Sequence, residues 1–94
     1  MKAFDWDAEK NEWLIRVRGV SFERVVFLIG NGGLLDVVAH HNPCRYPNQK
    51  ILIVNMDDYA WLVPFVESAD HYFLKTIIPS RKATRKYLEA SDEQ

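Results

Sequence analysis

Residues 72–89, with the sequence YFLKTIIPSRKATRKYLE, run from an apolar segment through Pro79 and Ser80 into a basic segment. The apolar run predicts a final strand over residues 72–78. Ser80 is expected to be the N-cap of a helix, because its hydroxyl can accept a backbone N–H of the first turn. Four cations then occupy neighbouring rows of that helix: Arg81, Lys82, Arg85 and Lys86. The stretch therefore predicts a strand that leads directly into a basic C-terminal helix.

The position of these cations within the helix is unusual. The helix macrodipole favours carboxylates in the first turn by roughly 0.3–1 kcal/mol each, so basic residues there oppose it. Cations held at a corner between a strand and a helix are well placed to bind a phosphate. Arg81 is the leading candidate, because a guanidinium can contact two phosphate oxygens at once. The alternative, which the sequence leaves open, is an ordinary solvated helix face.

The N-terminal third predicts a short strand and two helices. Residues 3–6 can form the strand, and Asp7 is expected to cap a helix that extends to about Val17 and ends at Gly19. A second helix follows the cap residue Ser21 and stops at the glycine-rich residues 30–33. Apolar residues at helical spacing form the expected core faces: Trp13, Leu14 and Val17 in the first helix, and Phe22, Val25, Val26 and Ile29 in the second.

The rest of the chain predicts strands. Strands are expected at residues 34–41, 50–56, 59–67 and 72–78, with a Pro/Asn-rich loop over 42–49 and a hairpin turn at Asp57 and Asp58. Pro64 predicts an edge or a bulge at its position. The predicted fold is α+β: a short N-terminal strand, two helices, an antiparallel four-stranded meander and a C-terminal helix.

The strand at residues 59–67 is apolar on both faces. Trp61, Val63 and Phe65 alternate with Leu62 and Val66. One face is expected to pack on the two N-terminal helices. The other is either covered by the C-terminal helix or left for a partner.

Composition bounds the class of protein. The 94 residues form one predicted domain, 1–94, with 48% hydrophobic and 27% charged residues, as in soluble globular proteins. No apolar run is long enough for a membrane span, and the N-terminus lacks a signal-peptide pattern. The single cysteine, Cys44, cannot form a disulfide within the chain. A cytoplasmic location is therefore expected. The net charge is −1, but bases concentrate in residues 16–24 and 81–86, which allows a local basic patch.

Three segments carry a resemblance to a known family. They are FDWDAEKN at 4–11, RVRGVSFE at 16–23 and IIPSRKATRK at 77–86. Together they resemble the BrnT-type toxins of bacterial type II toxin–antitoxin modules, which are small ribonucleases with a RelE-like fold. That family has a "WD-x-x-K-N" helix start, a "K-H-G-V-S-F" turn and a closing "I-S-A-R-x-A-T-R-x-E". Order and spacing agree over nearly the whole chain, although residues 31–70 match only as a pattern of strands.

The resemblance implies a function and partners. It implies a metal-independent endoribonuclease that acts on messenger RNA and is neutralised by a cognate antitoxin. That antitoxin would be a DNA-binding protein of the ribbon-helix-helix or a related type, and operator DNA would be bound only through it. The alternative is a non-catalytic protein-interaction module on the same fold. A stress-linked structural protein without nucleic-acid contact is a further alternative.

The resemblance also suggests site residues. Arg81 stands where the family has the arginine of "S-A-R", and Arg85 matches the second basic position of that motif. The turn departs from the family, because Val17 replaces the lysine and Arg18 replaces the histidine. Arginine keeps the positive charge but cannot act as a base near neutral pH. Arg18 is therefore either part of the site or a cation that stabilises the end of its helix.

Histidines are the candidates for the missing acid or base. His40, His41 and His71 have the right chemistry, but His40 and His41 are adjacent and point to opposite faces of a strand. The alternative for His40 and His41 is a structural one: both can be ordinary polar residues where a strand ends and a loop begins. Glu67 and Tyr87 are secondary candidates for the acid or base. The alternative is that Glu67 is a polar residue at a strand end and that Tyr87 packs beneath the C-terminal helix.

The remaining basic residues are assigned to substrate binding. Lys82, Lys86 and Lys75 are expected to contact RNA, although a one-residue offset would turn Lys75 to the other face of its strand. No metal or cofactor is expected. The spacing of His40, His41 and Cys44 is not that of a zinc finger, and no phosphate-binding loop or dinucleotide motif is present in the sequence.

Overall fold

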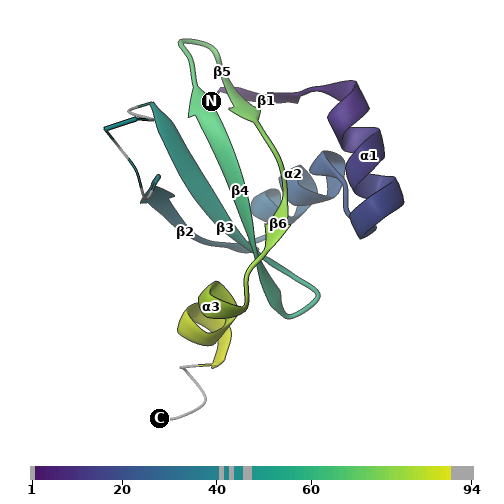
Figure 1. The fold of residues 1–94 in the computed structure, drawn as a ribbon, viewed down its shortest axis with the longest axis vertical. Coiled ribbons are helices and arrows are strands. Elements are labelled where there is room, and N and C mark those ends of the chain that lie inside the picture. The colour runs from purple at the N-terminus through teal and green to yellow at the C-terminus, as the bar shows by residue number, and fades with distance from the viewer. Residues whose placement is uncertain (1, 41, 43, 46–47, 90–94) are drawn as a thin grey trace.

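The computed structural model describes residues 2–40, 42, 44–45 and 48–89. Figure 1 shows an α+β arrangement of helices and strands, which confirms the predicted class. In chain order the elements are β1 (Ala3–Trp6), α1 (Ala8–Arg18), α2 (Phe22–Gly30), β2 (Leu34–Ala39), β3 (Gln49–Met56), β4 (Tyr59–Glu67), β5 (His71–Leu74), β6 (Ile78–Pro79), α3 (Arg81–Thr84) and the π-helical turn η1 (Arg85–Glu89).

The sheet is larger than predicted. Its order is β1-β5-β4-β3-β2, with β6 paired to β4, so six strands take part. The run from β2 to β5 is the predicted antiparallel meander. In addition, β1 lies parallel to β5, from Ala3 opposite His71 to Trp6 opposite Leu74. This mixed sheet corrects the expected four-stranded antiparallel one, and it does not match the specific RelE-like topology that the resemblance implies.

The last predicted strand, residues 72–78, is interrupted where it passes Pro64. It forms β5 and β6, which pair with different parts of β4. Between them the carbonyl of Pro64 accepts the N–H of Lys75 at 2.8 Å. Proline has no N–H to donate in return, so the regular ladder cannot continue at this point. The predicted edge or bulge at Pro64 is wrong, because β4 is a central strand whose register with β3 runs unshifted through Pro64. The interruption lies instead in the neighbouring strand, between β5 and β6.

Local signals in the sequence correctly marked the ends of several elements. Asp7 accepts the N–H of Glu9 at 3.3 Å and caps α1, while Gly19 ends it with φ of 70°. Ser21 caps α2 by accepting the N–H of Arg24 at 3.1 Å. The β3–β4 hairpin turns through two residues in the left-handed region, Asp57 and Asp58, with φ of 58° and 61°.

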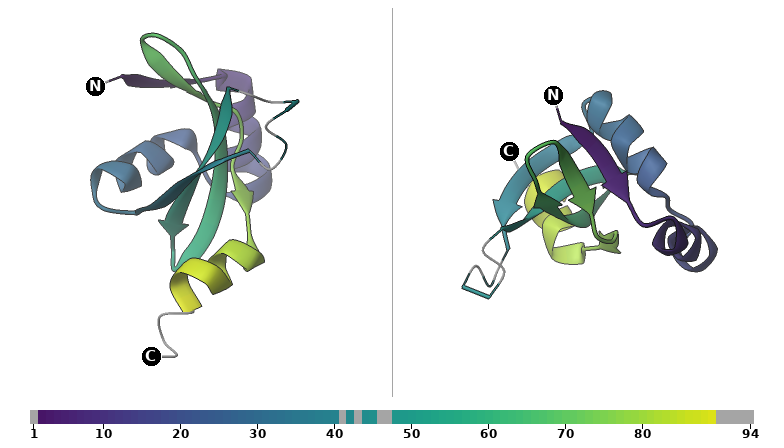
Figure 2. Two further views of the ribbon diagram at one scale, coloured as in Figure 1. Left: turned by 90° about the vertical axis from the view of Figure 1, so that its left-hand side faces the viewer. Right: turned by 90° about the horizontal axis from the view of Figure 1, so that it is seen from above.

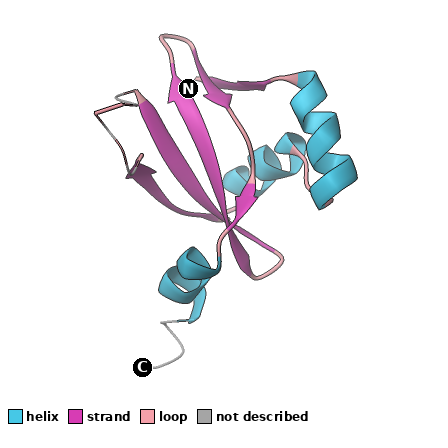
Figure 3. Cartoon of the chain, viewed as in Figure 1, coloured by secondary structure: helices cyan, strands magenta, loops and turns pink. Residues whose placement is uncertain are grey.

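Helix α2 packs on one face of the sheet with α1 at its margin, and α3 lies on the other face (Figure 2; Figure 3). The core under α1 and α2 is apolar and buried, with Leu14, Phe22, Val25, Val54, Val63, Phe65, Leu74 and Ile77 among its members. Phe22 also stacks on Trp6 with ring centroids 5.6 Å apart. The prediction that Val17 faces the core is wrong, because Val17 is 56% exposed. Helix α1 lies at the margin of the sheet and buries little besides Asn11 and Leu14.

The buried polar residue Asn11 joins the two N-terminal helices. Its side-chain oxygen accepts the backbone N–H of Phe22 at 2.8 Å, and its amide donates to Glu23 at 2.8 Å. The contact satisfies one of the N–H groups that every helix leaves unpaired in its first turn. Asn11 therefore fixes the start of α2 against the side of α1.

A second, smaller core lies beneath the C-terminal helix. Ile53, Ala60 and Ala83 are buried there, with Leu35, Val38, Leu62, Tyr87 and Leu88 packed around them. The C-terminal helix therefore covers part of the second sheet face, which the sequence had left open. The part it leaves uncovered forms a groove.

Candidate functional site: the basic C-terminal helix and its groove

The N-terminal end of α3 is held firmly on β4. As predicted, Ser80 is the N-cap, and its hydroxyl accepts the N–H of Ala83 at 3.1 Å. The backbone N–H of Ser80 donates to the carbonyl of Ala60 at 3.0 Å. Thr84 completes the joint, because its hydroxyl accepts the N–H of Ala60 at 2.9 Å and donates to the carbonyl of Ser80 at 2.7 Å. The basic residues between these contacts are therefore carried on a fixed frame.

The C-terminal helix consists of α3 and the turn η1 that continues it, and its η1 end is anchored on β2. The hydroxyl of Tyr87 donates to Asp36 at 2.6 Å, so the helix crosses the sheet from β4 to β2. The other carboxylate oxygen of Asp36 accepts the N–H of Val37 at 2.8 Å. Chiefly the Tyr87 hydrogen bond, and then that of Val37, lowers the pKa of Asp36 below its usual value. The same hydrogen bond to Asp36 raises the pKa of Tyr87, so its hydroxyl stays protonated, is a weak acid and serves as an anchor.

The Asp36–Tyr87 contact makes stability depend on pH. A carboxyl whose pKa is lowered in the folded state stabilises the fold above the unfolded value of 3.8, and that contribution is lost as pH falls through the folded pKa. Tyr87→Phe is therefore expected to lower the melting temperature at pH 7, and the difference from the parent should disappear on acidification below 3.8. Thermal unfolding of both proteins across pH 2–7 measures this. A difference that stays constant down to pH 2 would contradict the contact.

Two of the predicted substrate-binding lysines line the groove. Lys82 and Lys86, one turn apart, lie along a groove of about 490 Å³ beside the C-terminal helix. Its walls and floor are mainly apolar and include Val38, Ala39, Ile51, Ile53 and Leu62. The groove therefore combines a basic rim with an apolar floor.

Arg81 and Arg85 form the adjacent row of the same helix, and both are exposed. Neither guanidinium makes a hydrogen bond or ion pair within the described part of the chain. The structure thus brings the four predicted cations of this segment together on one anchored helix. Their charged ends remain available to an anion from solution.

His40 lies on the groove side of the sheet. Its N–H donates to the carbonyl of Gln49 at 3.2 Å and extends the β2–β3 pairing by one residue. Strand alternation places it on the same face as Val38. Its Nδ1 accepts the N–H of Asn42 at 3.1 Å. It is four residues from Asp36, or about 13 Å along an extended strand, so it is remote from Tyr87. Its partner Gln49 is six residues along β3 from Asn55, which pairs with Ala60 beside Ser80, so His40 is about 20 Å from the Arg81 end of the helix and does not line the groove. His41 lies outside the described residues.

Two other predicted site residues are placed elsewhere. Arg18 donates to the carbonyl of Ile77 at 2.6 Å and lies over the ring of Trp13 at 5.1 Å, so it ties α1 to the segment between β5 and β6. Lys75 lies near the start of α1 in a shallow depression shared with Asp7, Lys10 and Phe73. The structure does not place either of them in the groove. Glu67 and His71 also lie outside the lining of the groove, because Glu67 pairs with Lys2 and His71 is 3.8 Å from Asp70. Of the secondary candidates, only Tyr87 lines the groove within the described part of the chain.

Asp36 and Thr84 have important roles in the site that the sequence analysis missed. Asp36 is a carboxylate within an otherwise apolar strand, which is a signal that the sequence offered. In the structure it lies next to the register shift between Leu34 and Asp36. Thr84 gave no signal, because its partner Ala60 is far away in the sequence.

No family model, curated protein or solved structure matches this chain. Among the described residues, no group of three or more His, Cys, Asp or Glu side chains is arranged to hold a metal ion. Across the same residues, none of the helices is long and apolar enough to span a bilayer.

Proposed function

We propose that this chain is the toxin of a type II toxin–antitoxin module and that it cleaves messenger RNA without a metal ion. The observation that supports this most strongly is the exposed pair Arg81 and Arg85, one turn apart on a helix anchored at both ends. Cations with unoccupied donors, carried on an anchored backbone, suit the stabilisation of charge that develops in a transition state. The resemblance of the N- and C-terminal segments to BrnT-type toxins supports the same assignment.

The proposed reaction needs few groups. A base removes the proton of a ribose 2′-hydroxyl, and the oxygen attacks the adjacent phosphorus. The bond to the 5′-oxygen breaks, and that oxygen takes up a proton, leaving a 2′,3′-cyclic phosphate and a 5′-hydroxyl. Arg81 would hold two non-bridging oxygens of this phosphate. Lys82 and Lys86 would hold neighbouring phosphates along the groove.

Cleavage is expected to survive removal of divalent metal. The purified chain incubated with RNA in EDTA should cleave at the rate measured in magnesium, and the products should carry 2′,3′-cyclic phosphate ends. Cleavage that stops in EDTA and returns with magnesium would contradict the metal-free mechanism.

The groove also fits the proposed antitoxin. An acidic amphipathic segment could place apolar side chains on Leu62 and Ile53 and carboxylates beside Lys82 and Lys86, where RNA would bind. Expression with and without the adjacent gene tests this. Growth arrest by the chain alone, relieved by a neighbour-encoded protein that co-purifies with it, is the expected result. A chain that neither arrests growth nor retains a neighbour-encoded protein would overturn the toxin assignment.

A second candidate is a non-catalytic interaction module. It is favoured by Arg18, which occupies the position of the family's histidine and uses its guanidinium to bind the carbonyl of Ile77. An interaction module would bind the neighbour-encoded protein through the groove but would leave RNA intact. The cleavage assay and the co-purification together separate the two candidates.

A further inference from the structure

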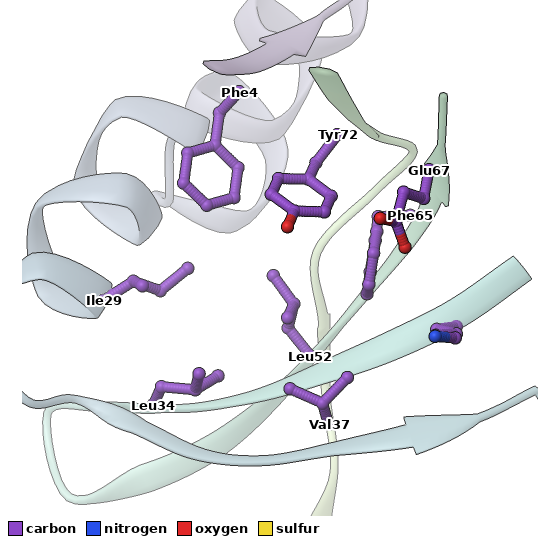
Figure 4. Close-up of a pocket in the computed structure, with 9 residues that line it drawn as sticks. Phe4, Ile29, Leu34, Val37, Leu52, Phe65, Glu67 and Tyr72 are labelled. Atoms are coloured by element: carbon purple, nitrogen blue, oxygen red, sulfur yellow. The ribbon is translucent and has the colours of Figure 1, made fainter. Parts of the chain in front are cut away.

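A second concavity lies on the helical face of the sheet, opposite the basic groove (Figure 4). It has a volume of about 280 Å³. Five strands and the end of α2 contribute to its lining: Phe4, Ile29, Leu34, Val37, Lys50, Leu52, Phe65, Glu67 and Tyr72. On β2 and β3 the residues alternate between the two sites, because Val37 and Leu52 line this cavity whereas Val38 and Ile51 line the groove.

The cavity exists because the helical layer ends before it covers the sheet. Helix α2 stops at Gly30, and the chain turns tightly back into β2. A Cβ at Gly33 would lie 2.9 Å from the carbonyl oxygen of Leu28, so the turn has no room for a side chain. Leu34 and Val37 are left 37% and 45% exposed at the open side. Apolar surface kept in contact with water costs about 25 cal/mol per Å², so an apolar occupant would be stabilising.

The polar groups of the cavity are few and gathered at one side. The hydroxyl of Tyr72 points into the space between Phe4, Ile29 and Leu52 (Figure 4). Glu67 is paired with Lys2, whose ammonium also lies 5.5 Å from the centre of the Tyr72 ring. Lys50 is near enough to Glu67 to interact with its charge. With two cations and one carboxylate, the rim carries a net positive charge that suits a single anionic group.

We propose that this cavity binds a small amphipathic carboxylate, with its apolar part against Leu52, Phe65 and Ile29 and its carboxylate beside Lys50. A largely apolar concavity with a few convergent polar groups is the usual form of a small-molecule site. At about 30 Å³ for a group the size of water, the volume accommodates roughly nine non-hydrogen atoms. The Tyr72 hydroxyl provides a further hydrogen-bond donor inside. This inference does not depend on RNA cleavage.

The test uses three probes of equal chain length: octanoate, octanol and octylamine. Titration of the labelled full chain, followed by NMR, should show octanoate binding with shifts at Val37 and Leu52 and none at Ile53 or Leu62 on the groove face. Octylamine should bind at least about 10-fold more weakly, because it places a cation beside Lys50. Equal affinities for octanoate and octylamine, or octanoate shifts confined to the groove face, would overturn the proposal.

Two variants and a matched control sharpen the test. Lys50→Gln should weaken octanoate about 10-fold and leave octanol unchanged. Val37→Trp, at an exposed position on the edge strand, should fill the cavity and abolish binding of both probes. Lys82→Gln removes a lysine from the opposite face and should change neither. If none of the three probes binds and a protein partner instead shifts Val37 and Leu52, the cavity receives a side chain of that partner and the small-ligand assignment is wrong.

Discussion

Arg81→Ala is expected to lower RNA cleavage by about 100- to 1,000-fold, which is the usual loss when one charge-stabilising donor is removed from a transition state. Growth arrest on expression should disappear with it. The fold should be retained, since Arg81 is exposed and its side chain forms no hydrogen bond within the described part of the chain. Arg81→Lys should recover little, because an ammonium cannot contact two phosphate oxygens in parallel.

The matched control is Arg16→Ala, which removes another exposed arginine from the last turn of α1. It should leave cleavage near the parental rate. Initial rates on a defined RNA, with melting temperatures of all three variants, provide the comparison. An Arg81→Ala protein that is folded and still cleaves at the parental rate would remove this residue from the mechanism.

Phe22→Ala is expected to destabilise the fold by about 3–5 kcal/mol, the typical cost of removing a fully buried aromatic side chain. Phe22 is 0% exposed and stacks on Trp6, so its loss would leave a cavity between α2 and β1. A 94-residue domain has a total stability of about 5–14 kcal/mol, at roughly 0.05–0.15 kcal/mol per residue. The variant should therefore lose a large part of its free energy of unfolding.

Phe27→Ala is the internal control, because Phe27 lies on the same helix and is 66% exposed. Its effect should stay within about 0.5 kcal/mol. Urea denaturation of both variants measures the difference. Similar losses for the two would show that the helix presents a different face to the sheet.

The sequence predicted the features that depend on neighbouring residues. Asp7, Ser21 and Ser80 each precede a helix and cap it through contacts within three residues, so their roles could be inferred from local pattern. The grouping of Arg81, Lys82, Arg85 and Lys86 follows in the same way from helical spacing. Pro64 indicated an irregularity in the sheet, because proline lacks the N–H that a ladder needs, but the sequence placed it in the wrong strand.

The remaining features depend on contacts between distant segments. Nothing in the four residues of β1 indicates that they pair in parallel with β5. Arg18 and Lys75 were assigned to the site by motif position, but their locations depend on how α1 packs beside β5 and β6. The anchor between Tyr87 and Asp36 joins residues 51 positions apart, a separation that no local periodicity encodes.

The parallel pairing of β1 with β5 also constrains the order in which the molecule can form. Ala3 is translated before its partner His71, which follows 68 residues later (71 − 3). At about 5–20 residues per second, translation delays the pairing by roughly 3–14 s. Throughout that interval the first strand has no neighbour along its ladder, while the meander from β2 to β4 can close from local hairpins. The first strand is therefore among the last parts of the sheet to be completed, and Phe4 lacks its ring contact with Tyr72 until then.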